Sequence, residues 1–177
     1  MKVFTTLVLG ILVCAVVALA AIYMLVPNTR SGTHSIMLNG TLDDVWTVYT
    51  DPASLPEWRA SVTNIENLSG MPGQRRWTEV SLHNVRIDFQ ETVFEAPSRY
   101  ALATVSEGYF TGSYSAVFEQ IEPGLVRGTF TETISTTGLR AKILAWLFVN
   151  PKTLIEEFAR DAQVEITRRA EQPQAQD

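Results

Sequence analysis

The stretch that decides the fold is His34–Arg59, HSIMLNGTLDDVWTVYTDPASLPEWR. Around Ile36 and Leu38 apolar and polar side chains alternate, which predicts a short half-buried strand. Thr41 stands three residues before Asp44, a spacing typical of a helix N-terminus in which two side chains cap the first backbone amides. Apolar side chains then recur at helical spacing: Leu42, Val45, Val48 and Tyr49. This pattern predicts a strand followed by a capped amphipathic helix.

Two prolines divide the end of this stretch. Pro52 and Pro56 each stand where the first turn of a helix tolerates proline, so we expect the helix to stop and restart there. A strand, a capped helix carrying Trp46 and a proline-punctuated turn holding Trp58 together resemble the N-terminal signature of the START-like superfamily. That superfamily includes the polyketide cyclase/dehydrase and lipid-transport proteins. The resemblance implies packing roles for both tryptophans.

The middle of the chain reads as strands separated by turns. The predicted strands are residues 62–68, 76–82, 84–95, 100–105, 109–119 and 125–135. Repeated strand–turn units without intervening helices indicate an antiparallel meander.

The period changes after Gly138. Residues 139–149 are almost wholly apolar, and Asn150-Pro151 then predicts the start of a last helix over 152–169. One face of that helix is apolar: Leu154, Ile155, Phe158, Ala162 and Ile166. The resemblance covers residues 34–170 and implies an α+β helix-grip fold, in which a curved antiparallel sheet wraps the long C-terminal helix around a hydrophobic cavity.

The N-terminal run of residues 3–26 contains no charged side chain. As a helix it would reach about 36 Å, enough to cross a hydrocarbon core of about 30 Å. We interpret it as a membrane anchor, and two alternatives remain. Ala18–Ala20 would serve as a signal-cleavage site, although the apolar run continues beyond it. Cys14 suggests a lipoprotein signal, but it follows Val13 where such signals carry a small residue.

The predicted organisation is an anchor over 1–30, a helix-grip domain over 31–170 and a polar tail over 171–177. Lys2 precedes the apolar run, and Arg30 and His34 follow it. This slight charge bias favours a single-pass protein of the cell membrane with an exported domain. The single cysteine lies in the apolar run, so the domain contains no internal disulfide.

Charge disfavours one class of function. Of 14 basic and 19 acidic side chains, only Lys2 and Arg30 precede residue 31, so the domain carries a net charge of about −7. Sequence-independent nucleic-acid binding needs positive charge that neutralises phosphates. We therefore expect no nucleic-acid partner. The oligomeric state is left open.

The catalytic inventory is small. His34 and His83 are the only histidines, and we interpret both as exposed residues near turns. The sequence holds no nucleophile elbow, zinc motif, phosphate loop or dinucleotide fingerprint. We therefore predict no metal, no cofactor and no recognisable catalytic set, which makes an enzyme the less favoured class.

Carboxylates on strands are the remaining chemical candidates. Glu132 lies between Phe130 and Ile134 at period two, so it shares their apolar face. Glu79 shares its face with Trp77, and Glu91 continues the face of Phe89 if no bulge intervenes. A carboxylate on an apolar interior face has a raised pKa and can act as a general base or bind a ligand. The alternative is that bulges or sheet edges return these side chains to solvent, or that Arg76, Arg86 or Arg127 pairs with them.

The resemblance places a ligand between the sheet and the closing helix. Our predicted cavity residues, with Glu132 as the polar contact, are Phe89, Phe130, Glu132, Trp146, Leu154 and Phe158. The favoured function is a membrane-anchored module that binds a lipid or another hydrophobic small molecule. The alternatives are a cofactor-independent cyclase or dehydratase that uses a pocket carboxylate, and a protein-interaction module if residues 139–149 are exposed.

Overall fold

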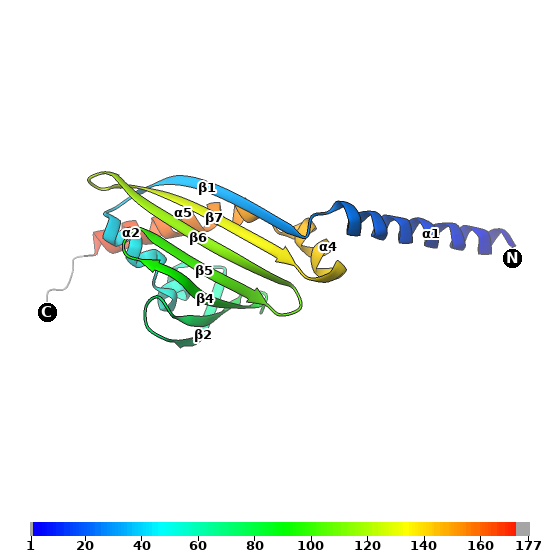
Figure 1. Cartoon of the computed structure of the whole chain (residues 1–177), viewed down its shortest axis with the longest axis horizontal. Coiled ribbons are helices and arrows are strands. Elements are labelled where there is room, and N and C mark those ends of the chain that lie inside the picture. Colours follow the sequence, from blue (N-terminus) through cyan, green and yellow to red (C-terminus); the bar gives the residue numbers. More distant parts are fainter. Residues whose placement is uncertain (1, 173–177) are drawn as a thin grey trace.

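The computed structural model describes residues 2–172, so residues 173–177 of the predicted tail lie outside the described part of the chain (Figure 1). A long helix projects from a domain in which short helices follow the first strand and two further helices follow the last strand. The elements in chain order are α1 (Lys2–Leu25), β1 (Thr29–Asn39), α2 (Leu42–Tyr49), the short 3-10 turn η1 (Pro52–Ser54), α3 (Leu55–Trp58), β2 (Val62–Ser69), β3 (Arg76–Ser81), β4 (Arg86–Glu95), β5 (Arg99–Ser106), β6 (Phe110–Glu122), β7 (Leu125–Thr136), α4 (Gly138–Phe148) and α5 (Pro151–Glu171).

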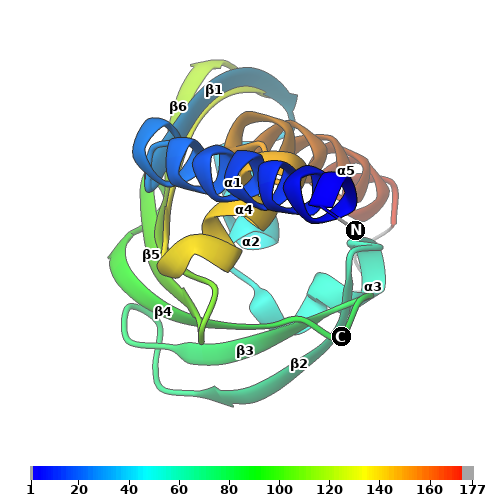
Figure 2. The same ribbon diagram turned by 90° about the vertical axis from the view of Figure 1, so that its right-hand side faces the viewer.

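The strands form one antiparallel sheet in the order β1-β7-β6-β5-β4-β3-β2. The sheet curls around α5 and α2, as the view along α1 shows (Figure 2). Four buried side chains of α5 join the hydrophobic core: Ile155, Ala159, Ala162 and Ile166. The predicted α+β helix-grip fold is confirmed.

The helix cap predicted in the opening stretch is present. The Thr41 hydroxyl accepts from the Asp44 amide at 3.2 Å, and the Asp44 carboxylate accepts from the Thr41 amide at 3.1 Å. The cap sets α2 with Val45 and Trp46 facing the core. Trp46 makes edge contacts with aromatic rings of the sheet, as expected for a packing residue.

The first strand is longer than predicted. It begins at Thr29, two residues before the predicted start of the domain, and pairs with β7 along its whole length. Its first residues are polar and so show no apolar alternation. On one face of the sheet their partners on β7 also carry hydroxyl groups, and the two strands exchange hydroxyl hydrogen bonds of about 3 Å: Thr29–Ser135, Ser31–Thr133, Thr33–Thr131 and Ser35–Thr129. Pairing with β7 therefore stabilises the start of β1, which the alternation of apolar and polar residues does not predict.

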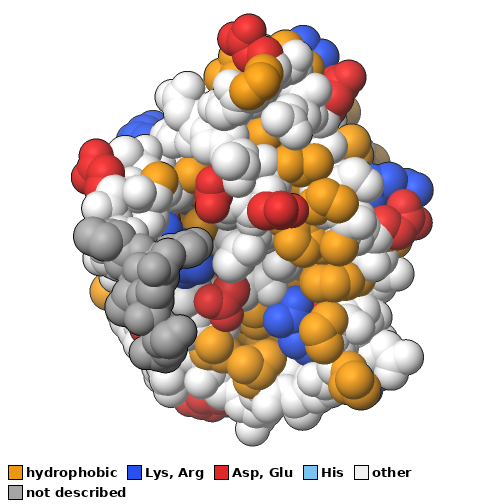
Figure 3. Space-filling model, turned by 90° about the vertical axis from the view of Figure 1, so that its left-hand side faces the viewer, with side chains coloured by type: hydrophobic (Ala, Val, Ile, Leu, Met, Phe, Trp, Pro, Cys, Tyr) orange, Lys and Arg blue, Asp and Glu red, His pale blue; other side chains and the backbone are white. Residues whose placement is uncertain are grey.

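The two ends of the molecule differ. Helix α1 leaves one end, and its segment Thr6–Leu25 is long and apolar enough to cross a membrane, with none of it buried in the domain. At the opposite end, acidic and basic side chains are interspersed among apolar ones (Figure 3).

Candidate functional site

A cavity of about 280 Å³ lies between the sheet, α4 and α5. Its walls are mostly apolar because inward-facing strand residues meet the apolar face of α5. The apolar lining from the sheet comprises Trp77, Ile87, Phe89, Leu102, Phe110 and Ile134. The helices contribute Leu55, Ala145, Val149, Leu154, Ile155 and Phe158.

Arg59 is a cationic group in this apolar cavity. Its Nη1 lies 3.6 Å from Oε2 of Glu79, and its guanidinium carbon lies 4.5 Å from the centroid of the Phe158 ring. Glu79 also accepts a hydrogen bond of 3.3 Å from the indole nitrogen of Trp77. Burial raises the pKa of Glu79, and the Arg59 charge opposes that rise.

Glu132 is the second acid of the cavity. Burial raises its pKa to about 7, Arg59 works against the rise and Glu79 adds to it. No described residue donates a hydrogen bond to its carboxylate. At neutral pH this carboxyl group is therefore a mixture of its protonated and charged forms, and its oxygens are available for hydrogen bonds to a ligand.

Two tyrosine hydroxyls at the cavity have no hydrogen-bond partner among the described residues. They belong to Tyr49 and Tyr114, and both oxygens are buried. Burial raises both pKa values, so both phenols stay protonated. Tyr114 lies directly across from Glu132 on the neighbouring strand. Because a buried polar group without a partner costs free energy, these hydroxyls are candidate contacts for a ligand.

The structure brings four of the six predicted residues to the cavity: Phe89, Glu132, Leu154 and Phe158. The other two are corrections. Phe130 is 1% exposed and stacks on Tyr49 with ring centroids 5.1 Å apart, so the core encloses it beyond the cavity wall. Trp146 is 53% exposed on the outer face of α4, and Ala145 and Val149 of the same segment line the cavity instead.

The remaining candidates have structural roles. Glu91 accepts hydrogen bonds from the Gly73 amide at 2.6 Å, from Arg75 at 2.8 Å and from the Tyr100 hydroxyl at 3.3 Å. A bulge follows Glu91 in β4, but the side chain stays 2% exposed and is not returned to solvent. Its arginine partner is Arg75, not one of the three arginines named from the sequence. Its bonding capacity is used within the fold.

Neither histidine lines the cavity. His83 is exposed at the β3–β4 turn, as predicted. The prediction for His34 was wrong, since it lies within β1, half-buried, with its Nδ1 3.6 Å from Glu156. Within residues 2–172, no three His, Cys, Asp or Glu side chains are grouped closely enough to hold a metal.

Sequence reasoning missed Arg59 and Tyr49 as cavity groups. Arg59 ends the opening stretch, directly after Trp58, where an arginine is usually a surface residue. Tyr49 lies on the apolar face of α2, and that pattern predicts burial but not a hydroxyl at a cavity. Neither position carries a motif that would have marked it.

A helix-grip domain with an acid-bearing apolar cavity is the class of protein that this fold and site define. The family model described as polyketide cyclase/dehydrase and lipid transport matches residues 29–167. The chain belongs to that family. No functionally curated protein matches it in sequence.

Solved structures share the fold at low sequence identity. The Zhui aromatase/cyclase from Streptomyces sp. R1128 has a TM-score of 0.68 at 13% identity, over 80% of this chain and 96% of that one. A point mutant of norcoclaurine synthase from Thalictrum flavum has a TM-score of 0.63 at 10% identity, over 80% and 96%. A conserved protein from Geobacillus kaustophilus has a TM-score of 0.61 at 20% identity, over 78% and 96%. At these identities the likeness establishes the fold alone.

Proposed function

We propose that the domain binds an apolar small molecule, with one or a few oxygen substituents, in the cavity between the sheet and α5. The observation that carries this proposal is the Glu132 carboxylate, which lies in an apolar cavity of about 280 Å³ without a hydrogen bond from any described residue. Pockets for small ligands typically begin at about 300 Å³ and combine apolar walls with a few polar groups. The cavity has this character.

The polar groups suggest what the ligand carries. Arg59 and the hydroxyls of Tyr49 and Tyr114 can donate hydrogen bonds, and Glu132 can donate or accept according to its protonation. An oxygenated ring or a lipid head with hydroxyl or carbonyl groups satisfies this set. In one neighbour of the same fold, norcoclaurine synthase, the structure holds dopamine and hydroxybenzaldehyde, which are small oxygenated aromatic molecules.

Filling the cavity tests the binding proposal. Phe158 lies on the cavity wall, in contact with Trp58 and below Arg59. We expect Phe158→Trp to weaken binding of the neutral dye N-phenyl-1-naphthylamine, measured by fluorescence titration, because the larger ring occupies the space. The folding cost should be roughly 1–3 kcal/mol. Phe158→Leu is the matched control, which keeps an apolar wall and should still bind the dye. Unchanged dye binding in a stably folded Phe158→Trp variant would reject the assignment of the cavity.

We also propose that α1 anchors the domain, with the N-terminus inside and the domain exported. The support is the length and apolar character of Thr6–Leu25, none of which is buried in the domain. An anchor keeps a module for apolar ligands beside the membrane, where such ligands concentrate.

A second candidate function is cofactor-independent acid–base catalysis, of the cyclase or dehydratase type. The observation that favours it is the pKa of Glu132, near 7, since such a carboxyl can take a proton from a substrate and return it at neutral pH. Its base form would remove a proton from carbon beside a carbonyl group, and the electron pair would move to the carbonyl oxygen, near the donors of Arg59 and Tyr114.

Proton exchange tests this second candidate. The substrates are hydroxyphenyl methyl ketones, which are acetophenones with a hydroxyl group on the ring. We expect the protein to speed exchange of their methyl protons in deuterated water, followed by proton NMR. Glu132→Gln should abolish the acceleration, because an amide cannot accept the proton. Glu119→Gln, which changes an exposed carboxylate on β6, is the matched control. Equal exchange rates for wild type and Glu132→Gln would remove the catalytic reading and leave the binding proposal standing.

A further inference from the structure

The end of the domain from which α1 leaves is held close to that helix. Only residues 26–28 lie between α1 and β1, and three residues span at most about 11 Å. The backbone oxygen of Asn28 accepts hydrogen bonds from the Thr136 amide at 2.9 Å and from its hydroxyl at 3.2 Å. If α1 spans a bilayer, this end of the domain must therefore lie at the bilayer surface.

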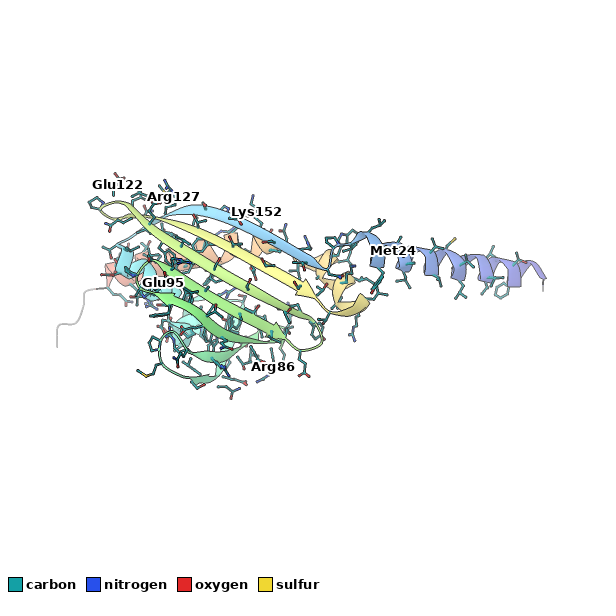
Figure 4. All side chains as sticks on the ribbon, viewed as in Figure 1. Met24, Arg86, Glu95, Glu122, Arg127 and Lys152 are labelled. Atoms are coloured by element: carbon teal, nitrogen blue, oxygen red, sulfur yellow. The ribbon has the colours of Figure 1, made fainter. Side chains whose placement is uncertain are left out.

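Helix α4 lies at this end, next to the part of α1 that carries Met24 (Figure 4). The Lys142 ammonium group donates to the backbone oxygen of Tyr23 at 2.6 Å and lies 5.0 Å from the centroid of the Tyr23 ring. Arg30, the second residue of β1, donates to the backbone oxygens of Ala145 at 3.1 Å and Val149 at 2.6 Å. These contacts set α4 beside the end of α1.

The outer face of α4 is apolar and exposed. Leu144 is 37% exposed, Trp146 53% and Leu147 55%. Tyr109, in the turn between β5 and β6 at the same end, is also exposed. Tryptophan and tyrosine are enriched where membranes meet water, because each has an apolar body and a polar tip.

The inner face of the same helix closes the cavity. Ala145 and Val149 belong to the cavity wall, and Trp146 lies beside Ala145 in sequence on the outer face. A single short segment therefore separates the cavity from the end of the domain that faces α1.

We propose that Leu144, Trp146 and Leu147 lie in the boundary between headgroups and acyl chains of the bilayer that α1 spans, and that apolar ligands pass between this bilayer and the cavity beside α4. This inference rests on the proposed anchor and on the proposed ligand cavity. The bilayer is the occupant we commit to because the short link between α1 and β1 holds this apolar face at the membrane surface.

Trp146 reports its own depth in the membrane. The other three tryptophans belong to other elements, Trp46 to α2, Trp58 to α3 and Trp77 to β3, and α1 contains none. We expect the tryptophan fluorescence of the full chain in phosphatidylcholine nanodiscs to be quenched when the acyl chains are brominated. The Trp146→Phe variant should lose most of that quenching. Equal quenching in the two proteins, or none in wild type, would overturn the inference.

The outcomes separate the inference from the proposals beneath it. Failure of the chain to co-migrate with nanodiscs would overturn both the anchor and this inference, and leave the cavity untouched. Failure of the wild-type chain to bind the dye while Trp146 quenching persists would count against the cavity and the passage of ligand, and would leave the membrane position of Trp146 standing. Disulfide-linked dimers of a Cys14→Ser, Leu147→Cys variant, without quenching of Trp146, would assign the face to a second copy and overturn the bilayer assignment.

Transfer kinetics test the passage of ligand. We expect Leu144→Ser combined with Leu147→Ser to slow transfer of N-phenyl-1-naphthylamine from phosphatidylcholine vesicles to the nanodisc-held protein severalfold, with the same dye affinity at equilibrium. Val164→Ser, on the exposed face of α5, is the matched control and should transfer dye as wild type does. Equal rates for the double variant and the control would overturn passage beside α4.

Discussion

At the scale of the residue, two glutamates of the sheet behave differently, Glu91 being buried and Glu132 half-buried at the cavity. Glu91 is surrounded by donors, including the Gly73 amide and both backbone and side chain of Arg75. Glu132 receives no hydrogen bond from a described residue and keeps a raised pKa. Hydrogen bonds to a buried carboxylate offset the cost of removing it from water, whereas a carboxylate left without them destabilises the fold. Glu132 therefore has the character of a group held for a ligand rather than for stability.

The raised pKa of Glu132 predicts a pH-dependent stability. Its folded pKa of about 7 exceeds the ordinary value of 4.5, so the folded state holds the proton more tightly than the unfolded state. Between pH 4.5 and 7 a rising pH therefore lowers the free energy of unfolding, and above pH 7 the full penalty is present. We expect Glu132→Gln to be more stable than wild type above pH 7, by roughly 1–3 kcal/mol, and similar to it below pH 4.5. Urea unfolding at several pH values measures this difference.

Dye binding gives a second readout of the same group. A charged Glu132 lowers the affinity of the cavity for a neutral apolar molecule. The dye affinity of wild type should therefore fall as pH rises through 7. Glu132→Gln should remove that dependence, whereas Glu119→Gln, an exposed substitution, should keep it. A wild-type affinity that does not change between pH 5 and 9 would contradict the assignment of Glu132 to the cavity.

At the scale of the element, close contact between β1 and α5 positions the cavity wall. Gly32 faces the start of α5, where an added Cβ would lie 2.8 Å from the Lys152 nitrogen and 3.2 Å from the Pro151 carbonyl carbon. Both are backbone atoms, so no side chain can move to make room. The absence of a side chain at Gly32 lets α5 begin against the sheet, which sets Leu154 and Phe158 at the cavity.

A methyl group at this contact should therefore destabilise the domain. We expect Gly32→Ala to lower the free energy of unfolding by roughly 1–3 kcal/mol, because the start of α5 must shift away from β1. Thr33→Ala is the control on the opposite face of the same strand. It removes one exposed hydroxyl pair with Thr131 and should cost less than about 1 kcal/mol. Urea unfolding of both variants compares them, and an equal cost at the two positions would show that the close contact has no special weight.

At the scale of the whole molecule, the separation of α1 from the domain predicts how the chain partitions. We expect the intact chain to stay with membranes through a carbonate wash, because Thr6–Leu25 is apolar and unburied. Deleting residues 1–25 should release a folded, soluble domain, seen by circular dichroism and gel filtration. The deletion stops short of Thr29 and Arg30, which belong to β1 and hold its pairing and the contact with α4. Recovery of wild type as a shortened soluble species would show that the segment is a cleaved signal.

The local parts of this architecture could be predicted from the sequence. The Thr41–Asp44 cap, the strand–turn units and the last helix each leave a pattern within a few neighbouring residues, and the structure reproduces them. The start of β1 could not be predicted, because its polar residues are stabilised by β7, about a hundred positions away. Pairing partners at that separation leave no trace in a single local pattern.

The candidate site could likewise be predicted from the sequence only in part. Alternation along β7 places Phe130 and Glu132 on one face of the sheet, but only the tertiary structure puts Tyr49 against Phe130 and leaves Glu132 at the cavity. Helix α4 is apolar on nearly every side, so its sequence could not say that Ala145 lines the cavity while Trp146 faces outward. By itself the sequence determined the order and type of the elements and the inward faces of the strands. Which inward residues surround a space was decided by the tertiary structure, because a cavity depends on packing between elements that are distant in the chain.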